Sequence, residues 1–193
     1  RTGSGKSSII KTIYGDLQLA GGLGSVGDYD LTRLKRKQIP ALRRTLGVVF
    51  QDFKLLPDRN IEDNLKFVLK ATGWKDKKEI DQKIDEVLDM VGIKVNREKF
   101  PSELSGGEQQ RVALVRSIAP NPKLIFLDEP FSSLDAELRE STRLEVHQLL
   151  KSVNMSAILV THDQEEALSF SDQLAVMSEG RIEQIGPPEP IYR

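Results

Sequence analysis

The first residues of the chain have the composition of a phosphate-binding loop. They are Gly3-Ser4-Gly5-Lys6-Ser7-Ser8, which match the end of the pattern G-x-x-x-x-G-K-S/T. In such a loop, successive backbone N–H groups curve around phosphate oxygens, and the next helix points its N-terminus at the same anion. Lys6 would contact the β- and γ-phosphates, and the Ser7 hydroxyl would ligate Mg²⁺. A flexible Gly/Ser-rich terminus is the alternative, because the first glycine of the pattern would precede Arg1.

Two adjacent acids follow an apolar run of strand length. Residues 124–130 are Leu-Ile-Phe-Leu-Asp-Glu-Pro. In open α/β sheets, ligands bind at the carboxyl ends of the strands. Asp128 is placed to hold Mg²⁺ through water, and Glu129 to polarise an attacking water. The alternative is an ordinary strand end with solvated acids. The phosphate loop makes this alternative less favoured, because such a loop and a pair of acids after a strand recur together as the two halves of one magnesium site.

A third motif combines a helix cap with two glycines. Residues 104–111 are Leu-Ser-Gly-Gly-Glu-Gln-Gln-Arg. Ser105 is a good N-cap, and Gly106 and Gly107 leave the amides of the first turn open, which predicts a second anion receptor. Glu108 stands three residues after Ser105 and fits a capping box equally well. The local pattern leaves both interpretations open.

Apolar periodicity predicts the elements that must position these motifs. Strands are expected at 46–50, 124–127 and 157–160, and a hairpin is expected at 174–177 and 181–184. Helices are expected after Gly5, within 60–91 with a break at Gly73–Trp74, from Ser105, and over 136–153. Residues 20–30 are expected to form turns and short strands. Pro40 is expected to interrupt a basic, partly helical stretch at 31–44. Apolar strands separated by helices predict a parallel sheet covered on both faces.

The composition excludes several classes of protein. The 193 residues contain 28 Lys+Arg and 29 Asp+Glu, and this balance is unlike the basic excess of a general nucleic-acid binder. The absence of Cys excludes a disulfide framework and a thiolate nucleophile. No apolar stretch approaches the roughly 18 residues that would span a bilayer. We therefore expect a cytosolic globular chain whose first residues precede Arg1.

The ordered motifs resemble those of the ATP-binding cassette ATPases, the cytosolic motors of ABC transporters. The eight-residue signature at 104–111 is highly specific, and the resemblance covers essentially the whole chain. It implies an α/β, RecA-like P-loop NTPase fold, with a parallel sheet, an inserted all-helical subdomain and N-terminal strands missing before Arg1. The expected division is 1–53 for the first part of the core, 54–115 for the helical signature subdomain and 116–193 for the second part of the core.

The resemblance also implies a role for individual residues. Gln51, in Val-Val-Phe-Gln-Asp-Phe, looks like the glutamine that touches Mg²⁺ and the attacking water, and His162, in Val-Thr-His-Asp, looks like the switch histidine; a plain loop residue and a structural histidine are the alternatives. The residues implied for catalysis are Glu129, His162 and Gln51, and those implied for the metal are Ser7, Gln51 and Asp128. The residues implied for ATP binding are Arg1, Thr2, Gly3, Ser4, Gly5, Lys6, Ser7 and Ser8. The signature that acts in trans would be Ser105, Gly106, Gly107 and Glu108, and the dimer-contact loop would contain Ser133 and Asp135.

The partners follow from the same resemblance. Lys6 and Ser105 lie on different predicted subdomains, so one chain is not expected to close both anion receptors around one phosphate tail. The family solution is a head-to-tail homodimer, or a pair with a homologous cassette, in which each ATP lies between the phosphate loop of one subunit and the signature of the other. ATP favours the closed dimer and hydrolysis releases it. The implied cofactors are ATP and Mg²⁺, and the implied partner is an integral membrane subunit at the cytoplasmic face of the inner membrane, with no nucleic acid.

Different parts of the chain resemble different members of the family. Residues 49–59 look like the bacterial cell-division ATPase, whereas 128–135 and 161–168 look like importer ATPases of the maltose, polyamine or ferric-iron type. The tail at 186–192 resembles the point where those importers continue into a regulatory domain. A natural chain and a mosaic both fit, and the role is either transport or cell division. A soluble ABC-type ATPase and a truncated, non-hydrolysing fragment are the alternatives.

Overall fold

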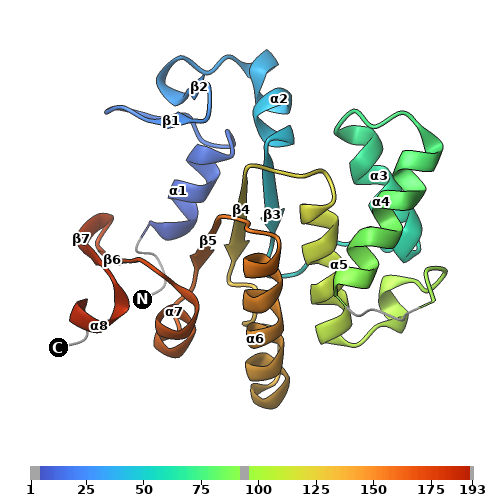
Figure 1. Cartoon of the computed structure of the whole chain (residues 1–193). Helices are drawn as coiled ribbons and strands as arrows, with labels where there is room; N and C mark the ends of the chain where they lie inside the picture. Colours follow the sequence, from blue (N-terminus) through green and yellow to red (C-terminus); the bar gives the residue numbers. More distant parts are fainter. Residues whose placement is uncertain (1–4, 92–95, 192–193) are drawn as a thin grey trace. The chain divides into compact units, whose positions relative to one another are not determined.

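The computed structural model describes residues 5–91 and 96–191, which form two compact units (Figure 1). Unit 1 comprises Arg1–Leu46 and Leu159–Arg193, and unit 2 comprises Gly47–Ile158. The unit boundaries fall within strands β3 (Leu46–Val49) and β5 (Ala157–Val160). This division follows the contacts of the backbone, and the predicted boundaries after residues 53 and 115 stay a prediction.

The central sheet has the order β3-β4-β5, with β4 (Leu124–Asp128) in the middle. Its strands are parallel and lie among helices, so the predicted α/β class is confirmed. Ile125, Phe126 and Leu127 of β4 are all buried, which is typical of a parallel strand with both faces covered. Each of the three predicted strand runs forms a strand at the expected place.

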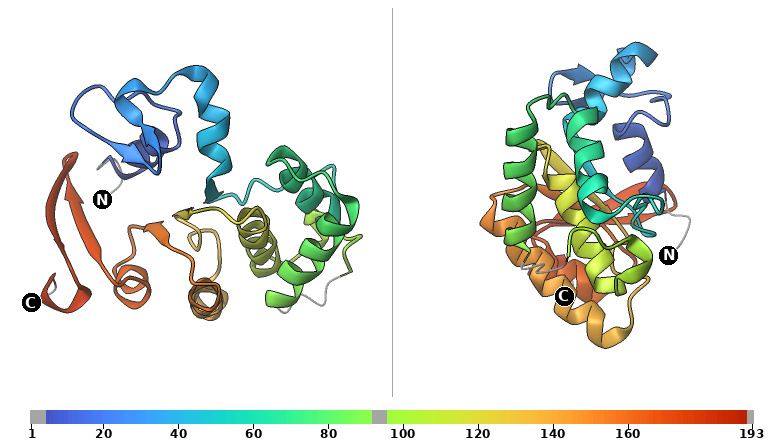
Figure 2. Two further views of the ribbon diagram at one scale, coloured as in Figure 1. Left: turned by 45° about the horizontal axis from the view of Figure 1, so that its top comes forward. Right: turned by 90° about the vertical axis from the view of Figure 1, so that its right-hand side faces the viewer.

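Helices α3 (Ile61–Ala71), α4 (Lys77–Met90) and α5 (Gly106–Ile118) form the helical part of unit 2. Their buried apolar side chains form one cluster, made of Ile61, Leu65, Leu69, Ile80, Ile84, Val87, Leu88, Leu104, Val112, Val115 and Ala119. Trp74, at the break between α3 and α4, packs against this cluster. Figures 1 and 2 show α5 between the α3–α4 pair and strand β4, so α5 contributes to both the helical cluster and the cover of the sheet.

Polar caps set where the helices of unit 2 begin. Asn60 caps α3 by accepting a hydrogen bond from Asp63 N at 2.8 Å, and Asp76 caps α4 by accepting from Lys78 N and Glu79 N. Asp135 caps α6 (Ala136–Ser152) in the same way. Asn64 is fully buried, and its carboxamide bonds the backbone of the segment that leads into α3, accepting from Leu56 N at 2.9 Å. These bonds satisfy a buried polar group and fix the chain between β3 and α3.

Unit 1 contains short elements from both ends of the chain. They are α1 (Lys6–Ile13), β1 (Ser25–Val26), β2 (Tyr29–Asp30), η1 (Leu31–Arg33), η2 (Arg36–Gln38), α2 (Ile39–Arg44), α7 (Gln164–Phe170), β6 (Leu174–Ser178), β7 (Arg181–Gly186) and α8 (Pro188–Ile191). Strands β6 and β7 pair antiparallel, which confirms the predicted terminal hairpin. Arg43 of α2 lies 4.3 Å above the Tyr14 ring and also pairs with Asp16, which docks α2 beside the end of α1.

The expected interruption at Pro40 is wrong. Pro40 occupies the first turn of α2, where a backbone N–H has no partner within the helix. The missing N–H therefore costs nothing there, and the fixed φ of proline favours helix initiation. Among the described residues, no helix combines the length and the apolar character needed to cross a bilayer.

Helix α5 approaches the sheet very closely at Gly47 of β3. A Cβ at this position would lie 2.8 Å from Ser117 O and 3.0 Å from Ile125 Cγ1. Gly47→Ala should therefore lower the free energy of unfolding by about 1–3 kcal/mol, the usual cost of overpacking. Urea denaturation of the purified protein measures the change. Gly21→Ala is the control, because its Cβ would meet nothing within 4 Å, and a similar loss for both variants would contradict this account.

Candidate functional site

The described part of the phosphate-loop motif begins a helix in unit 1. Gly5 has φ 90°, a conformation that only glycine adopts without strain, and is the N-cap of α1. Its carbonyl oxygen accepts hydrogen bonds from Ser8 N at 3.1 Å and Ile9 N at 3.2 Å. The predicted anion would lie where Lys6 and Ser7 form the first turn, which carries no acidic residue. The predicted ATP-binding residues Arg1, Thr2, Gly3 and Ser4 lie outside the described residues.

Glu129 has a strained backbone directly after β4. Its φ is 48°, which is uncommon for any residue but glycine. The following Pro130 narrows the choice further, because a residue before proline favours an extended conformation. Ser132 closes the turn by donating to Glu129 O from its backbone N at 3.3 Å and from its hydroxyl at 2.8 Å. Strain of this kind costs roughly 1–3 kcal/mol and gathers at functional sites. No feature of the sequence predicted it.

Gln51 lies in an exposed turn after β3, and the two residues at 53 and 54 are also strained. Phe53 has φ 58° and Lys54 has φ 46°. Arg116 of α5 donates to both of their carbonyl oxygens, at 2.9 Å to Phe53 O and 2.6 Å to Lys54 O. Gln51 and the acids of β4 follow adjacent parallel strands, so they belong to the same edge of the sheet in unit 2. The role of Arg116 has no signal in the sequence.

The signature motif forms a complete capping box. The Ser105 hydroxyl accepts from Glu108 N at 3.3 Å, and the Glu108 carboxylate accepts from Ser105 N at 2.7 Å and Ser105 Oγ at 2.8 Å. These two bonds hold the pKa of the Glu108 carboxyl below its ordinary value, and the bond from the Ser105 backbone has a larger effect than the bond from its hydroxyl. The capping-box interpretation is confirmed, and it leaves the exposed Ser105 at the surface of the helix start.

The two signature glycines also make room for neighbouring leucines. A Cβ on Gly106 would lie 3.1 Å from Leu134 Cδ2, and one on Gly107 would lie 3.1 Å from Leu138 Cδ1. The start of α5 therefore packs closely on the segment that contains the exposed Ser133 and Asp135. The structure thus brings together the predicted signature and the predicted dimer-contact loop, through a packing role for glycine that the motif pattern did not predict.

His162 is exposed in unit 1, between β5 and α7. A hydrogen-bonded ring surrounds its peptide. Thr161 Oγ1 donates to the buried Glu166 carboxylate at 2.6 Å and accepts from Asp163 N at 3.0 Å. The Asp163 carboxylate in turn accepts from Glu166 N at 3.2 Å and caps α7. The backbone on both sides of His162 is therefore fixed.

The predicted metal ligands suit a hard cation in type. The Ser7 hydroxyl, the Gln51 amide and the Asp128 carboxylate are all oxygen donors, which Mg²⁺ prefers. Over residues 5–91 and 96–191, no group of three or more His, Cys, Asp or Glu could hold a metal ion. Mg²⁺ commonly keeps several waters and binds one or two carboxylates plus substrate phosphates, so a single acid fits that ion.

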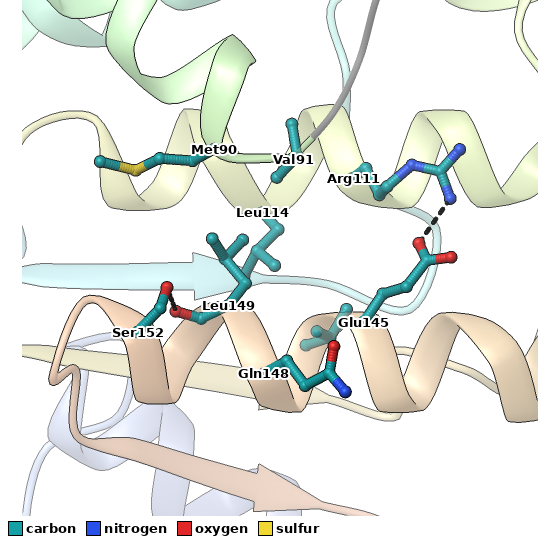
Figure 3. A pocket seen from close by; sticks show the side chains of 9 residues that line it. Met90, Val91, Arg111, Leu114, Glu145, Gln148, Leu149 and Ser152 are labelled. Carbon is teal, nitrogen blue, oxygen red and sulfur yellow. Dashed lines mark hydrogen bonds and ion pairs between the residues drawn. The ribbon is translucent and has the colours of Figure 1, made fainter.

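A cavity of about 280 Å³ lies elsewhere, among α4, α5 and α6 (Figure 3). Its walls include Met90, Val91, Leu114 and Leu149, and the ion pair of Arg111 with Glu145. Arg111 Nη1 and Glu145 Oε2 are 2.9 Å apart and face each other at one end. None of the motif residues that were assigned a role lines this cavity, so the chemistry predicted from the sequence does not depend on it.

The fold and the capped motifs define a P-loop NTPase of the cassette type. The family described as ABC transporter matches residues 1–132. The chain belongs to the ABC transporter family, which confirms the resemblance seen in the sequence.

Two relatives that match the chain over its whole length are named import ATP-binding proteins. The Fe(3+) ions import ATP-binding protein FbpC 2 of Rhizobium meliloti is 42% identical over 193 residues, which cover 100% of this chain and 47% of that protein. The sulfate/thiosulfate import ATP-binding protein CysA 2 of Chromobacterium violaceum is 45% identical and is covered to 50%. The chain therefore spans about half the length of the curated relatives it matches.

A solved structure shares the fold. A dimeric ATP-binding cassette, MJ0796, in a post-hydrolysis state bound to ADP and Pi, aligns with a TM-score of 0.82 at 28% identity. The alignment covers 97% of this chain and 82% of that chain. The predicted P-loop NTPase fold is thereby confirmed.

The capping box predicts an acid-dependent stability. Because its pKa is lowered in the native state, the Glu108 carboxylate contributes stability above its ordinary pKa, and this contribution is lost as pH falls through the lowered pKa. Glu108→Gln does not titrate, so wild type should be the more stable near neutral pH, and the difference should shrink in acid. Urea midpoints across this range measure it.

Ser105→Ala removes one of the two hydrogen bonds to that carboxylate. It should cost about 1 kcal/mol at neutral pH, the usual cost of a lost N-cap, and it should weaken the same acid dependence. A difference between wild type and Glu108→Gln that stays constant with pH would contradict the assignment.

Proposed function

We propose that the chain is the Mg-ATP-hydrolysing nucleotide-binding subunit of an ABC membrane complex. Two such subunits would pair head-to-tail around ATP and drive an integral membrane partner. The observation that carries the proposal is the strained acid at the sheet edge: Glu129, held at φ 48° by Ser132, directly after Asp128 at the end of β4. Its support comes from the family match, which includes this strand and the signature.

The residues would divide the chemistry as follows. Glu129 is the general base that polarises the attacking water, and its fixed backbone directs the carboxylate without further reorganisation. Gln51, on the same sheet edge, orients that water and contacts the metal. Lys6 and the first turn of α1 bind the phosphate tail. Hydrogen bonds among Thr161, Asp163 and Glu166 fix the backbone on both sides of His162. The His162 side chain donates a hydrogen bond to the γ-phosphate.

The metal would be Mg²⁺, held by Ser7, Gln51 and Asp128, with the waters and phosphates that this ion keeps. When bound, it would neutralise negative charge on the phosphates during hydrolysis. The protein contributes oxygen donors and the buried strand that ends at Asp128.

The dimer would place the signature against the ATP of a second subunit. Ser105 is exposed at the capped start of α5, and the adjacent contact loop with Ser133 and Asp135 is exposed as well. Both surfaces are therefore accessible to a second cassette, either a copy of this chain or a homologue. The dimeric state of the MJ0796 cassette supports this arrangement.

The role would be import rather than cell division. The FbpC 2 and CysA 2 relatives carry import names over the whole chain, and this favours the importer resemblance of 128–135 and 161–168. Their solutes, ferric ion and sulfate or thiosulfate, differ at nearly equal identity, so the similarity favours no single solute. The subunit would lie peripherally on the cytoplasmic face of the inner membrane. The cell-division resemblance of 49–59 stays a prediction.

Glu129→Gln tests the proposed function. In the complete natural protein, the substitution should lower ATP turnover by about 10²–10⁴-fold, the usual contribution of a general base. Binding of ATP and ATP-dependent dimerisation should persist, because the amide keeps the size and the acceptor. Phosphate release and size-exclusion chromatography with ATP measure the two effects.

Glu140→Gln is the matched control, because Glu140 is a glutamate on α6 that has no part in the predicted site. It should leave turnover unchanged. Unchanged turnover in Glu129→Gln would refute the base assignment. Binding without hydrolysis in the wild type would favour the non-hydrolysing alternative, and activity bound to ribosomes or DNA rather than to a membrane partner would favour the soluble ATPase.

A further inference from the structure

The last turn of α5 bonds the chain on both sides of Gln51. On the C-terminal side, the Arg116 guanidinium donates to Phe53 O and Lys54 O, across 62 residues of sequence in the second case. On the N-terminal side, Ser117 Oγ lies 2.9 Å from Val48 O of β3 and donates to it. Adjacent residues of one helix therefore hold the strand that leads into the Gln51 turn and the backbone that leaves it.

The backbone that Arg116 holds would not keep its conformation unaided. Two successive residues other than glycine, Phe53 and Lys54, have positive φ, which is strained for any residue that has a Cβ atom. Local interactions offset part of this cost. Phe53 is buried and its N–H donates to Phe50 O at 2.9 Å, and the Lys54 ammonium lies 2.6 Å from the Asp52 carboxylate. The two hydrogen bonds from Arg116 to the carbonyl oxygens of Phe53 and Lys54 support this conformation from a distant part of the chain.

Arg116 is suited to hold two carbonyls at once. Its guanidinium presents several donors in a rigid plane, whereas a lysine ammonium is a single point charge on a flexible stem. The side chain is partly buried, and this burial lowers the pKa of Arg116. In such surroundings a hydrogen bond from a charged donor is strong, and leaving the donor unsatisfied is costly.

We propose that Arg116 is a positioning residue that holds Phe53 and Lys54 in their strained conformation and so fixes Gln51 relative to α5. Since α5 begins at the signature, the helix would transmit a displacement of the signature to Gln51 as one rigid piece of 13 residues. The inference rests on the proposed function for the part of Gln51 in hydrolysis. The hydrogen-bonded clamp itself stands on the geometry of unit 2 alone.

A rescue experiment tests the clamp in the complete natural protein. Arg116→Lys keeps the charge but loses the planar fork. It should speed amide hydrogen exchange of residues 51–56 about ten-fold or more and lower the kcat of ATP hydrolysis about 10–100-fold, the effect of misplacing a reacting group by about 1 Å. The KM for ATP should change much less, because Arg116 is not placed at the nucleotide.

The second variant is Lys54→Gly in the Arg116→Lys background. Glycine adopts positive φ without cost, so it should restore slow exchange and most of the lost kcat if strain is what Arg116 offsets. Lys75→Gly is the matched control, an exposed lysine in a loop and not among the residues with positive φ. It should restore neither quantity.

The outcomes separate the two claims. Failure of Lys54→Gly to rescue, or equal rescue by Lys75→Gly, would overturn the clamp, since a purely packing role for Arg116 would not respond to the conformation of residue 54. Unchanged exchange at residues 51–56 in Arg116→Lys would overturn it as well. Full hydrolysis by Gln51→Ala would instead refute the catalytic role of Gln51 in the proposed function, while the exchange measurements continue to decide the clamp.

Discussion

The close approach of helix α5 to strand β3 is the constraint on which the rest of unit 2 depends. Gly47 has no room for a side chain because Ser117 O of α5 and Ile125 of β4 lie so near. At that separation the Ser117 hydroxyl reaches Val48 O and the Arg116 guanidinium reaches the backbone beyond Gln51. A bulkier residue at 47 would push α5 outward, and both of these bonds would lengthen.

The same helix is also closely packed at its other end. Because Gly106 and Gly107 have no side chains, Leu134 and Leu138 can pack directly against the start of α5. These leucines follow the turn that contains Glu129. One face of α5 contributes to the apolar cluster with α3 and α4. The helix is thus closely packed at both ends: one end begins at the predicted signature, and the other bonds the backbone before and after the predicted water-orienting glutamine.

The elements and motifs could be predicted well, for physical reasons that apply to each. Strand β4 has an uninterrupted apolar run because both of its faces are buried, and α5 has a serine and a glutamate at the spacing of a capping box because a helix start needs acceptors. Pro40 led to a wrong prediction, since the pattern does not say whether a proline lies inside a helix or in its first turn. The positive φ of Phe53, Lys54 and Glu129 could not be predicted, because such conformations exist only when distant groups support them.

Arg116 therefore also bears on the order in which the protein folds. Its partner at Lys54 precedes it by 62 residues, so on a ribosome the strained turn emerges long before the side chain that supports it. Until α5 has formed, Phe53 and Lys54 are free to adopt ordinary negative φ values, and Gln51 has no fixed position. A contact between residues so far apart in sequence closes a large loop and forms late. The nascent cassette would thus acquire its helices and strands first, and a competent Gln51 only when the helix that carries the signature has docked.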